Sequence, residues 1–244
     1  KAMKKQQAYD IIGDIHGCHE QLLDLLEALG YRIEDGCHRH AEGKKVAFLG
    51  DFIDPKGEEK THHDVPAVLK VVKAMVDAGE AVAVMGNHEF NAVAYATMTS
   101  DGSYLRPHKD DADAGLKLSI SAFEGGHRGA EWLSWIEWFK TLPLFLELDG
   151  LRLVHAYWHV DSIAKLSGKT LKNAAFLVKA ATKGNVEYDW IENVLKGYEI
   201  PLPEGESYYD HTQIERDHFR AKWFENEPVG KSARELIFPK DSFD

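Results

Sequence analysis

The stretch YDIIGDIHG, residues 9–17, decides the fold of this 244-residue chain. Its first four residues form a short run rich in β-branched side chains, typical of a buried strand, and Gly13-Asp14 ends that run. The same arrangement occurs at residues 46–51 and 81–87, where an apolar run is followed by glycine and then by Asp51 or Asn87. Each of the three strands therefore ends in glycine and a residue that can bind a metal.

Helical patterns separate these three strands. Leucines recur at helical spacing over residues 18–29, and valines and leucines do so over residues 65–78. Both patterns stop at a glycine, Gly30 or Gly79. Strands that alternate with helices predict an α/β fold with a parallel sheet. Since ligands bind beyond the carboxyl ends of such strands, we expect the functional site at that edge.

The later part of the chain is predicted to add helices and one hairpin. Trp132, Trp135, Ile136 and Phe139 lie three or four residues apart, which favours a core-facing helix over a cofactor site. Asp149-Gly150 predicts a hairpin turn between residues 144–148 and 151–155, with His155 ending the second strand. Beyond Asp161 we expect two helices and then a polar stretch over residues 201–217.

Composition limits the classes of partner. Hydrophobic residues make up 44% and charged residues 28%, which is ordinary for a soluble globular protein, and the length suits one domain over residues 1–244. No apolar run approaches the ~20 residues of a membrane-spanning helix, and Lys1–Asp10 lacks the apolar core of a signal peptide. Cys18 and Cys37 have no metal-type spacing, so we expect free thiols and a cytoplasmic location.

The formal net charge of −11 argues against duplex nucleic acid as a partner. It leaves small phosphorylated substrates open, because divalent ions bound in an acidic cleft would reverse the local sign of the charge.

The first strand-terminal motif offers a carboxylate and an imidazole. Asp14 and His16 are two residues apart, so in an extended turn both side chains can point to one side. This pair suits a borderline transition metal, and Gly13 and Gly17 allow tight backbone geometry around an ion.

The second and third motifs add further chemistry. Asp51 could bridge two metals with its two oxygens, and Asp54 could orient a histidine. Asn87 supplies a neutral oxygen ligand, and the adjacent His88 could donate a proton. Each motif is weak alone, but three in this order are highly specific together.

With these motifs, the chain resembles the calcineurin-like metallophosphoesterases, in the branch shared with serine/threonine phosphoprotein phosphatases and symmetrical diadenosine-tetraphosphate hydrolases. The resemblance is clear from Ile11 to about His155 and looser beyond. It implies an α/β fold with a two-sheet sandwich flanked by helices. It also implies metal-dependent hydrolysis of phosphate esters.

The resemblance further implies a site with two divalent ions. Asp14 and His16 would hold the first ion, Asp51 would bridge both, and Asn87 and His155 would hold the second. Manganese is expected first, with iron, zinc, nickel or magnesium as alternatives, because a mixed nitrogen and oxygen ligand set suits several metals.

The mechanism implied by this site is hydrolytic. A hydroxide that bridges the metals would attack phosphorus in line. His88 would protonate the leaving group, with Asp54 as its partner.

One departure from the family pattern follows Asp54. The family has Arg-Gly there and the arginine grips phosphate, whereas this chain has Pro55-Lys56-Gly57. Either two residues are missing before Pro55, or Lys56 is a poorer substitute that lacks the bidentate guanidinium fork. Arg106, after the third motif, could reach a phosphate or lie on the surface.

Other departures affect the second metal. The family has a further ligand histidine in a Gly-His segment near the C-terminus, but this chain stops at Asp244, and His211 is a poor candidate for that role. The family also usually has two glycines where Ala156 and Tyr157 stand. We therefore expect that the chain is truncated at its C-terminal end, or that the second metal binds weakly.

Three functions remain open. The chain could be a phosphomonoesterase acting on a small phosphorylated substrate or a phosphoprotein, or a dinucleoside-polyphosphate hydrolase. It could also be a degenerate member that binds metal or phosphate without turnover, an alternative that the missing arginine favours and that His88 and Asp54 oppose. The sequence does not indicate an oligomeric state.

Overall fold

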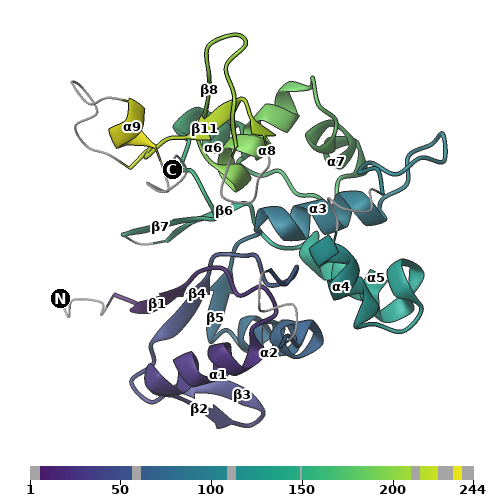
Figure 1. Cartoon of the computed structure of the whole chain (residues 1–244). Helices are drawn as coiled ribbons and strands as arrows, with labels where there is room; N and C mark the ends of the chain where they lie inside the picture. Colours follow the sequence, from purple (N-terminus) through teal and green to yellow (C-terminus); the bar gives the residue numbers. More distant parts are fainter. Residues whose placement is uncertain are drawn as a thin grey trace.

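A three-stranded parallel sheet lies at the centre of the protein (Figure 1). The computed structural model describes residues 6–56, 62–108, 114–148, 150–209, 215–224 and 233–237. The strands are β1 (Tyr9–Ile12), β4 (Lys45–Phe48) and β5 (Ala81–Ala83), in the order β1-β4-β5. The predicted parallel sheet is confirmed, and all three strands end at the same edge.

Two helices cover one face of this sheet. They are α1 (His19–Ala28) and α2 (Val65–Asp77), and the antiparallel hairpin of β2 (Tyr31–Glu34) and β3 (Cys37–His40) packs beside them. The hairpin was not predicted. Its turn uses left-handed backbone at two successive residues, 35 and 36.

The sequence of α2 explains its bounds. The Asp64 side chain caps the helix by accepting a hydrogen bond from the backbone N–H of Ala67, at 2.9 Å. Pro66 stands in the first turn, where its missing N–H costs nothing. Apolar side chains three or four residues apart are fully buried against the sheet: Val65, Val68, Leu69, Val72 and Met75.

A second, smaller sheet covers the other face. It is the hairpin of β6 (Phe145–Leu148) and β7 (Leu151–Val154) (Figure 1). Its Leu153 is buried with Ala47 of β4 and with Val84, which directly follows β5. Leu148 pairs with Leu151, so the loop has the predicted two residues. One of them, residue 149, lies outside the described residues. The predicted two-sheet sandwich is confirmed, and in the described part its second sheet has two strands.

The remaining elements are mainly helical. They are α3 (Asn87–Ala96), α4 (Ala114–Ser121), η2 (Gly126–Arg128), α5 (Ala130–Phe139), α6 (Val160–Leu166), α7 (Ala174–Ala181), α8 (Val186–Lys196), β8 (Glu199–Pro201), β9 (Tyr208–Tyr209), β10 (Glu215–Arg216), β11 (His218–Arg220) and α9 (Ala233–Leu236). The predicted core-facing stripe of α5 is buried as expected. Of the helices in the described ranges, none is long and apolar enough to cross a membrane.

The prediction of two helices after Asp161 was wrong, because α6, α7 and α8 follow one another there. Left-handed backbone at Gly168 interrupts the helical pattern after α6. Asn173 then starts α7 by accepting a hydrogen bond from the backbone N–H of Phe176.

The turns after β4 and β5 pack against each other through two glycines. A Cβ on Gly50 would lie 2.2 Å from the backbone nitrogen of Gly86, and a Cβ on Gly86 would lie 2.2 Å from Oδ1 of Asp51. No side chain fits at either position. The glycines at the ends of the strands therefore bring the second and third motifs into contact.

A buried carboxylate holds these two turns together. Glu89, in the first turn of α3, is fully buried. It accepts hydrogen bonds from three backbone N–H groups, those of Asp51 (2.8 Å), Phe52 (2.8 Å) and Gly86 (3.0 Å). Glu89 thus provides an acceptor for a backbone N–H at the start of α3 and ties this helix to the turn after β4.

We expect Glu89→Gln to destabilise the fold by about 1–3 kcal/mol for each backbone donor that loses its acceptor. The amide keeps one acceptor oxygen and turns an N–H₂ group toward backbone N–H groups that also donate. Urea unfolding would measure the loss. The matched control is Glu137→Gln, an exposed change on α5 that should cost less than about 0.5 kcal/mol. Equal stability of the two variants would contradict this role.

Candidate metal centre

Three histidines from different parts of the chain converge on one carboxylate oxygen. Oδ2 of Asp51 lies 3.5 Å from Nε2 of His155 and 3.8 Å from Nε2 of both His16 and His88. His16 follows β1, Asp51 follows β4, His88 starts α3 after β5, and His155 follows β7. Asp51 is 2% exposed, so these groups meet in a largely buried place.

Each of the three imidazoles is fixed through its other nitrogen. Nδ1 of His16 lies 2.8 Å from the Ile53 carbonyl oxygen, and Nδ1 of His155 lies 2.6 Å from the Leu49 carbonyl oxygen. Since a carbonyl oxygen only accepts, each Nδ1 carries the proton and donates it. The lone pair of Nε2 then faces Asp51, as in histidines that bind metals.

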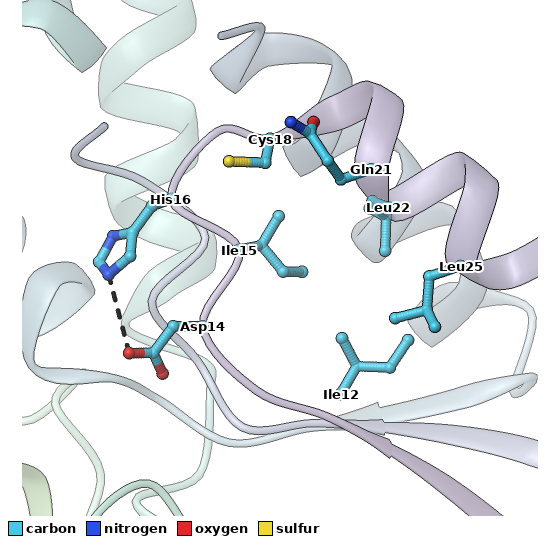
Figure 2. Close-up of a pocket in the computed structure, with 8 residues that line it drawn as sticks. All are labelled: Ile12, Asp14, Ile15, His16, Cys18, Gln21, Leu22 and Leu25. Carbon is cyan, nitrogen blue, oxygen red and sulfur yellow. Dashed lines mark ion pairs between the residues drawn. The ribbon is translucent and has the colours of Figure 1, made fainter. Parts of the chain in front are cut away.

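Asp14 and Asn87 add two further oxygen atoms that could bind a metal ion. Oδ2 of Asp14 lies 3.7 Å from Nε2 of His16 (Figure 2). Oδ1 of Asn87 lies 3.0 Å from Nε2 of His155. With the assigned amide orientation and with Nδ1 of His155 donating, both of these atoms are acceptors, an arrangement that a cation between them would favour.

The backbone of the site is left-handed at three residues other than glycine. φ is 47° at His16, 54° at Asp51 and 65° at Asp54. The first motif is therefore a left-handed turn and not the extended turn that the sequence analysis expected. Such conformations cost about 1–3 kcal/mol each in non-glycine residues and cluster at functional sites.

The other side of the first motif is apolar. Ile12, Ile15 and Leu22 are buried there, and together with Leu25 and residues of the loop they line a cavity of about 270 Å³ (Figure 2). In Figure 2 the His16 ring lies on the opposite side of the loop from α1. The turn thus separates the packing of α1 from the centre.

The charges at the site shift several pKa values. The neighbouring His16 side chain lowers the pKa of Asp14. Burial alone would lower the pKa of His16, but Asp14, the Ile53 carbonyl and Asp51 together raise it. Burial, followed by the Asp51 charge, raises the pKa of Glu89. The centre therefore concentrates negative charge that favours a bound cation.

Two groups of side chains could each hold a metal ion, and they share Asp51. One consists of His16, Asp51 and His88, and the other of Asp14, Asp51 and His155. In each group one ligand atom per residue lies within 4.8 Å of the others. The mixed carboxylate and imidazole donors fit divalent transition metals. Geometry alone also allows His88 to act as a ligand, a role that the sequence analysis did not assign to it.

Asp54 holds the His88 ring, and Ser119 in turn positions Asp54. Nδ1 of His88 donates to Oδ2 of Asp54 at 2.6 Å. The hydroxyl of Ser119 on α4 donates to Oδ1 of Asp54 at 3.0 Å and accepts from the Asp54 backbone N–H at 2.8 Å. Ser119 is fully buried and was missed by the sequence analysis, because no motif links it to a partner 65 residues away.

Glu89 was also given no role in the sequence analysis. Its signal was present, because glycine followed three residues later by glutamate at a helix start is a capping pattern.

The two predicted phosphate-binding residues lie in different places. Nζ of Lys56 lies 2.8 Å from Nε2 of His16, so the Lys56 ammonium group faces the lone pair of a predicted metal ligand. Arg106 lies in a separate cavity of about 390 Å³ between α3 and α8, where it donates to Oδ1 of Asn91 at 3.4 Å. The weaker candidate ligand, His211, lies outside the described residues.

Comparisons with known proteins agree with this geometry. A family model described as calcineurin-like phosphoesterase matches residues 9–167. The bis(5'-nucleosyl)-tetraphosphatase PrpE of Geobacillus thermodenitrificans (strain NG80-2), named as asymmetrical, is 42% identical over 224 residues, which cover 86% of this chain and 80% of that protein. The protein of the same name from Bacillus velezensis is 39% identical over 169 residues, covering 66% of this chain and 61% of that protein.

Coverage differs among the relatives. A further PrpE protein, from Halalkalibacterium halodurans, is 39% identical over 80 residues, or 33% of this chain and 30% of that protein. The chain thus spans less than two thirds of the length of this relative and of the one from Bacillus velezensis. All three are named as asymmetrical hydrolases, whereas the resemblance noted from the motifs was to symmetrical ones.

The family model covers most of the chain, and it includes all of the strands and loops that build the centre. The chain belongs to the calcineurin-like phosphoesterase family.

Proposed function

We propose that this protein hydrolyses phosphate esters with the help of two divalent metal ions. The observation that carries the proposal is the convergence of three Nε2 atoms on Oδ2 of Asp51 within 3.8 Å, of which those of His16 and His155 present a lone pair. Divalent ions bound here would supply positive charge that polarises a phosphoryl group and acidifies water.

The residues proposed to hold the ions are Asp14, His16, Asp51, Asn87 and His155. Asp51 is proposed as the bridge because it belongs to both ligand groups. Its Oδ1 accepts a hydrogen bond from the His88 backbone N–H at 3.0 Å. Oδ2 is therefore the oxygen that faces the histidine side chains of the centre. Manganese is the ion we propose first, with iron, zinc, nickel and magnesium as alternatives.

His88 is proposed as the proton donor to the leaving oxygen. Its Nδ1–H is tied to Asp54, so Nε2 is the atom that can carry a proton toward the centre. Asp54 stabilises the charged imidazole and fixes its orientation. If His88 were instead a metal ligand, the variant His88→Ala would lose metal.

Lys56 and Arg106 are proposed to bind substrate phosphates. The Lys56 ammonium already lies at the centre, but it offers a point charge and no bidentate fork. Arg106 shares its cavity with two further cations, Lys183 and Lys196, and with one anion, Glu192. This cavity is therefore suited to an anionic group.

A dinucleoside polyphosphate is the substrate that we propose. The support is the name of the relatives, which are bis(5'-nucleosyl)-tetraphosphatases, together with the cationic cavity beside α3. Phosphomonoesters and phosphoproteins are the alternatives, and a substrate panel with product chromatography separates them. The low cysteine content, two residues in 244, supports a reducing, cytoplasmic compartment.

The first expected result is manganese-dependent hydrolysis of para-nitrophenyl phosphate. Activity should fall to background when a chelator removes divalent ions, and added Mn²⁺ should restore it. Metal binding without turnover of this ester or of any substrate in the panel would support the degenerate alternative.

We expect Asp51→Asn to abolish binding of two metals while the fold is retained. The amide can place only one oxygen, so it either loses the ligand atom at the centre or turns N–H₂ toward the donating His88 N–H. Elemental analysis and circular dichroism of the purified variant measure both outcomes. Two equivalents of metal in the folded variant would contradict the bridging role.

We expect His88→Ala to lower turnover of an alkyl phosphate by ~10²–10⁴. The loss should be smaller for an aryl phosphate, whose leaving oxygen needs little protonation. Asp54→Asn should have the same pattern in a weaker form, and both variants should keep their metal content. Equal losses on both substrates, or loss of metal from His88→Ala, would instead point to packing or ligation.

A further inference from the structure

Three aromatic side chains gather at the surface where the segment after β7 meets the end of α8. The ring centroids of Tyr157 and Tyr198 are 5.5 Å apart, and those of Tyr157 and Trp223 are 5.2 Å apart. Tyr198 is 44% exposed and Trp223 is 39% exposed. We call Tyr157, Tyr198 and Trp223 the aromatic platform. Large aromatic side chains that gather at the surface mark places where a ligand or partner binds.

Backbone hydrogen bonds hold the platform together. The N–H groups of Ala156 and Tyr157 both donate to the carbonyl of Val194 in α8, at 3.1 and 3.4 Å. The N–H of Ala221 donates to the carbonyl of Tyr198 at 2.8 Å. Three segments that follow β7, α8 and β11 are thus joined, so the rings do not depend on a loose loop for their positions.

The platform begins next to a predicted metal ligand. Tyr157 is two residues after His155, so their Cα atoms are at most about 7 Å apart. Tyr157 also stands where the family resemblance implies glycine, so its ring is not needed to hold the ions. The platform is thus carried by the segment that directly follows a predicted ligand of the centre.

The surroundings favour an anionic occupant. The helix α8, which anchors Tyr157, also lines the cationic cavity through Lys196, and Lys183 and Arg106 lie in the same cavity. Lys196 pairs with Glu192 at 2.7 Å, so the excess positive charge of the cavity rests with Lys183 and Arg106, in a chain whose net charge is −11. A ligand with both a flat aromatic group and a chain of phosphates matches the platform and the cavity together.

On the basis of the function proposed above, we propose that the aromatic platform stacks the base of a nucleoside polyphosphate whose scissile phosphate lies at Asp51. Stacking on aromatic side chains suits any base, because every base has a π face. The platform would then distinguish nucleotide substrates from simple phosphate esters and from phosphoproteins.

The first test compares two substrates in the full chain with Mn²⁺. The ratio of KM for diadenosine tetraphosphate to KM for para-nitrophenyl phosphate should rise about tenfold or more in Tyr157→Ala and in Trp223→Ala. Tyr157→Phe keeps the ring and should stay within about twofold of the wild type. The matched control is Tyr209→Ala, since Tyr209 is an exposed tyrosine on β9. An unchanged ratio in both platform variants would overturn the proposal.

A binding measurement separates this proposal from the proposed function. Calorimetry with adenosine diphosphate should show a Kd about tenfold weaker in Tyr157→Ala than in the wild type, whereas the Kd of inorganic pyrophosphate, which has no base, should change less than about twofold. Absence of hydrolysis by the wild type would count against the proposed function alone, because the calorimetry still tests the platform. Equal weakening of both ligands, or of neither, would overturn the platform and would point to a structural role or to another partner.

Discussion

The carboxylate of Glu89 fixes the spacing between the turn after β4 and the start of α3, and the rest of the centre depends on that spacing. Its three backbone hydrogen bonds leave Asp51 in a left-handed conformation that the chain would not otherwise favour. From this position Asp51 accepts from the His88 N–H with one oxygen and faces three imidazoles with the other. Strain in the turn is thus offset by hydrogen bonds in a buried place.

The sheet was predictable because its signal is local. An apolar run that ends in glycine and a polar residue predicts a strand. It also predicts the edge of the sheet at which the polar side chain lies, as for Asp14, Asp51 and Asn87. His155 could be added because a two-residue turn fixes the hairpin before it. The family resemblance then supplied roles that spacing alone leaves open.

Other parts of the site depend on contacts that local patterns do not record. Ser119 reaches Asp54 only because α4 packs there, and the left-handed backbone at His16 depends on a turn whose N–H groups donate to the Asp51 carbonyl. The positions of long flexible side chains are harder still to predict from sequence. The sequence placed Lys56 and Arg106 after the second and third motifs, but only packing decides that one lies at His16 and the other across α3. For the same reason, no pattern predicted that α8 would anchor Tyr157.

The distribution of charge resolves an apparent conflict between an acidic chain and an anionic substrate. Acceptors gather at the centre, where Oδ1 of Asn87 and Nε2 of His155 face each other and Oδ2 of Asp51 faces the Nε2 atoms of three histidines. Such a place attracts divalent ions, which reverse its sign. Lys183, Lys196 and Arg106 instead line a separate cavity between α3 and α8, where a phosphate chain could extend away from the ions. A simple phosphate ester would need only the ions, whereas the substrate proposed above, which continues beyond the scissile phosphate, would also use the cations and the rings near α8.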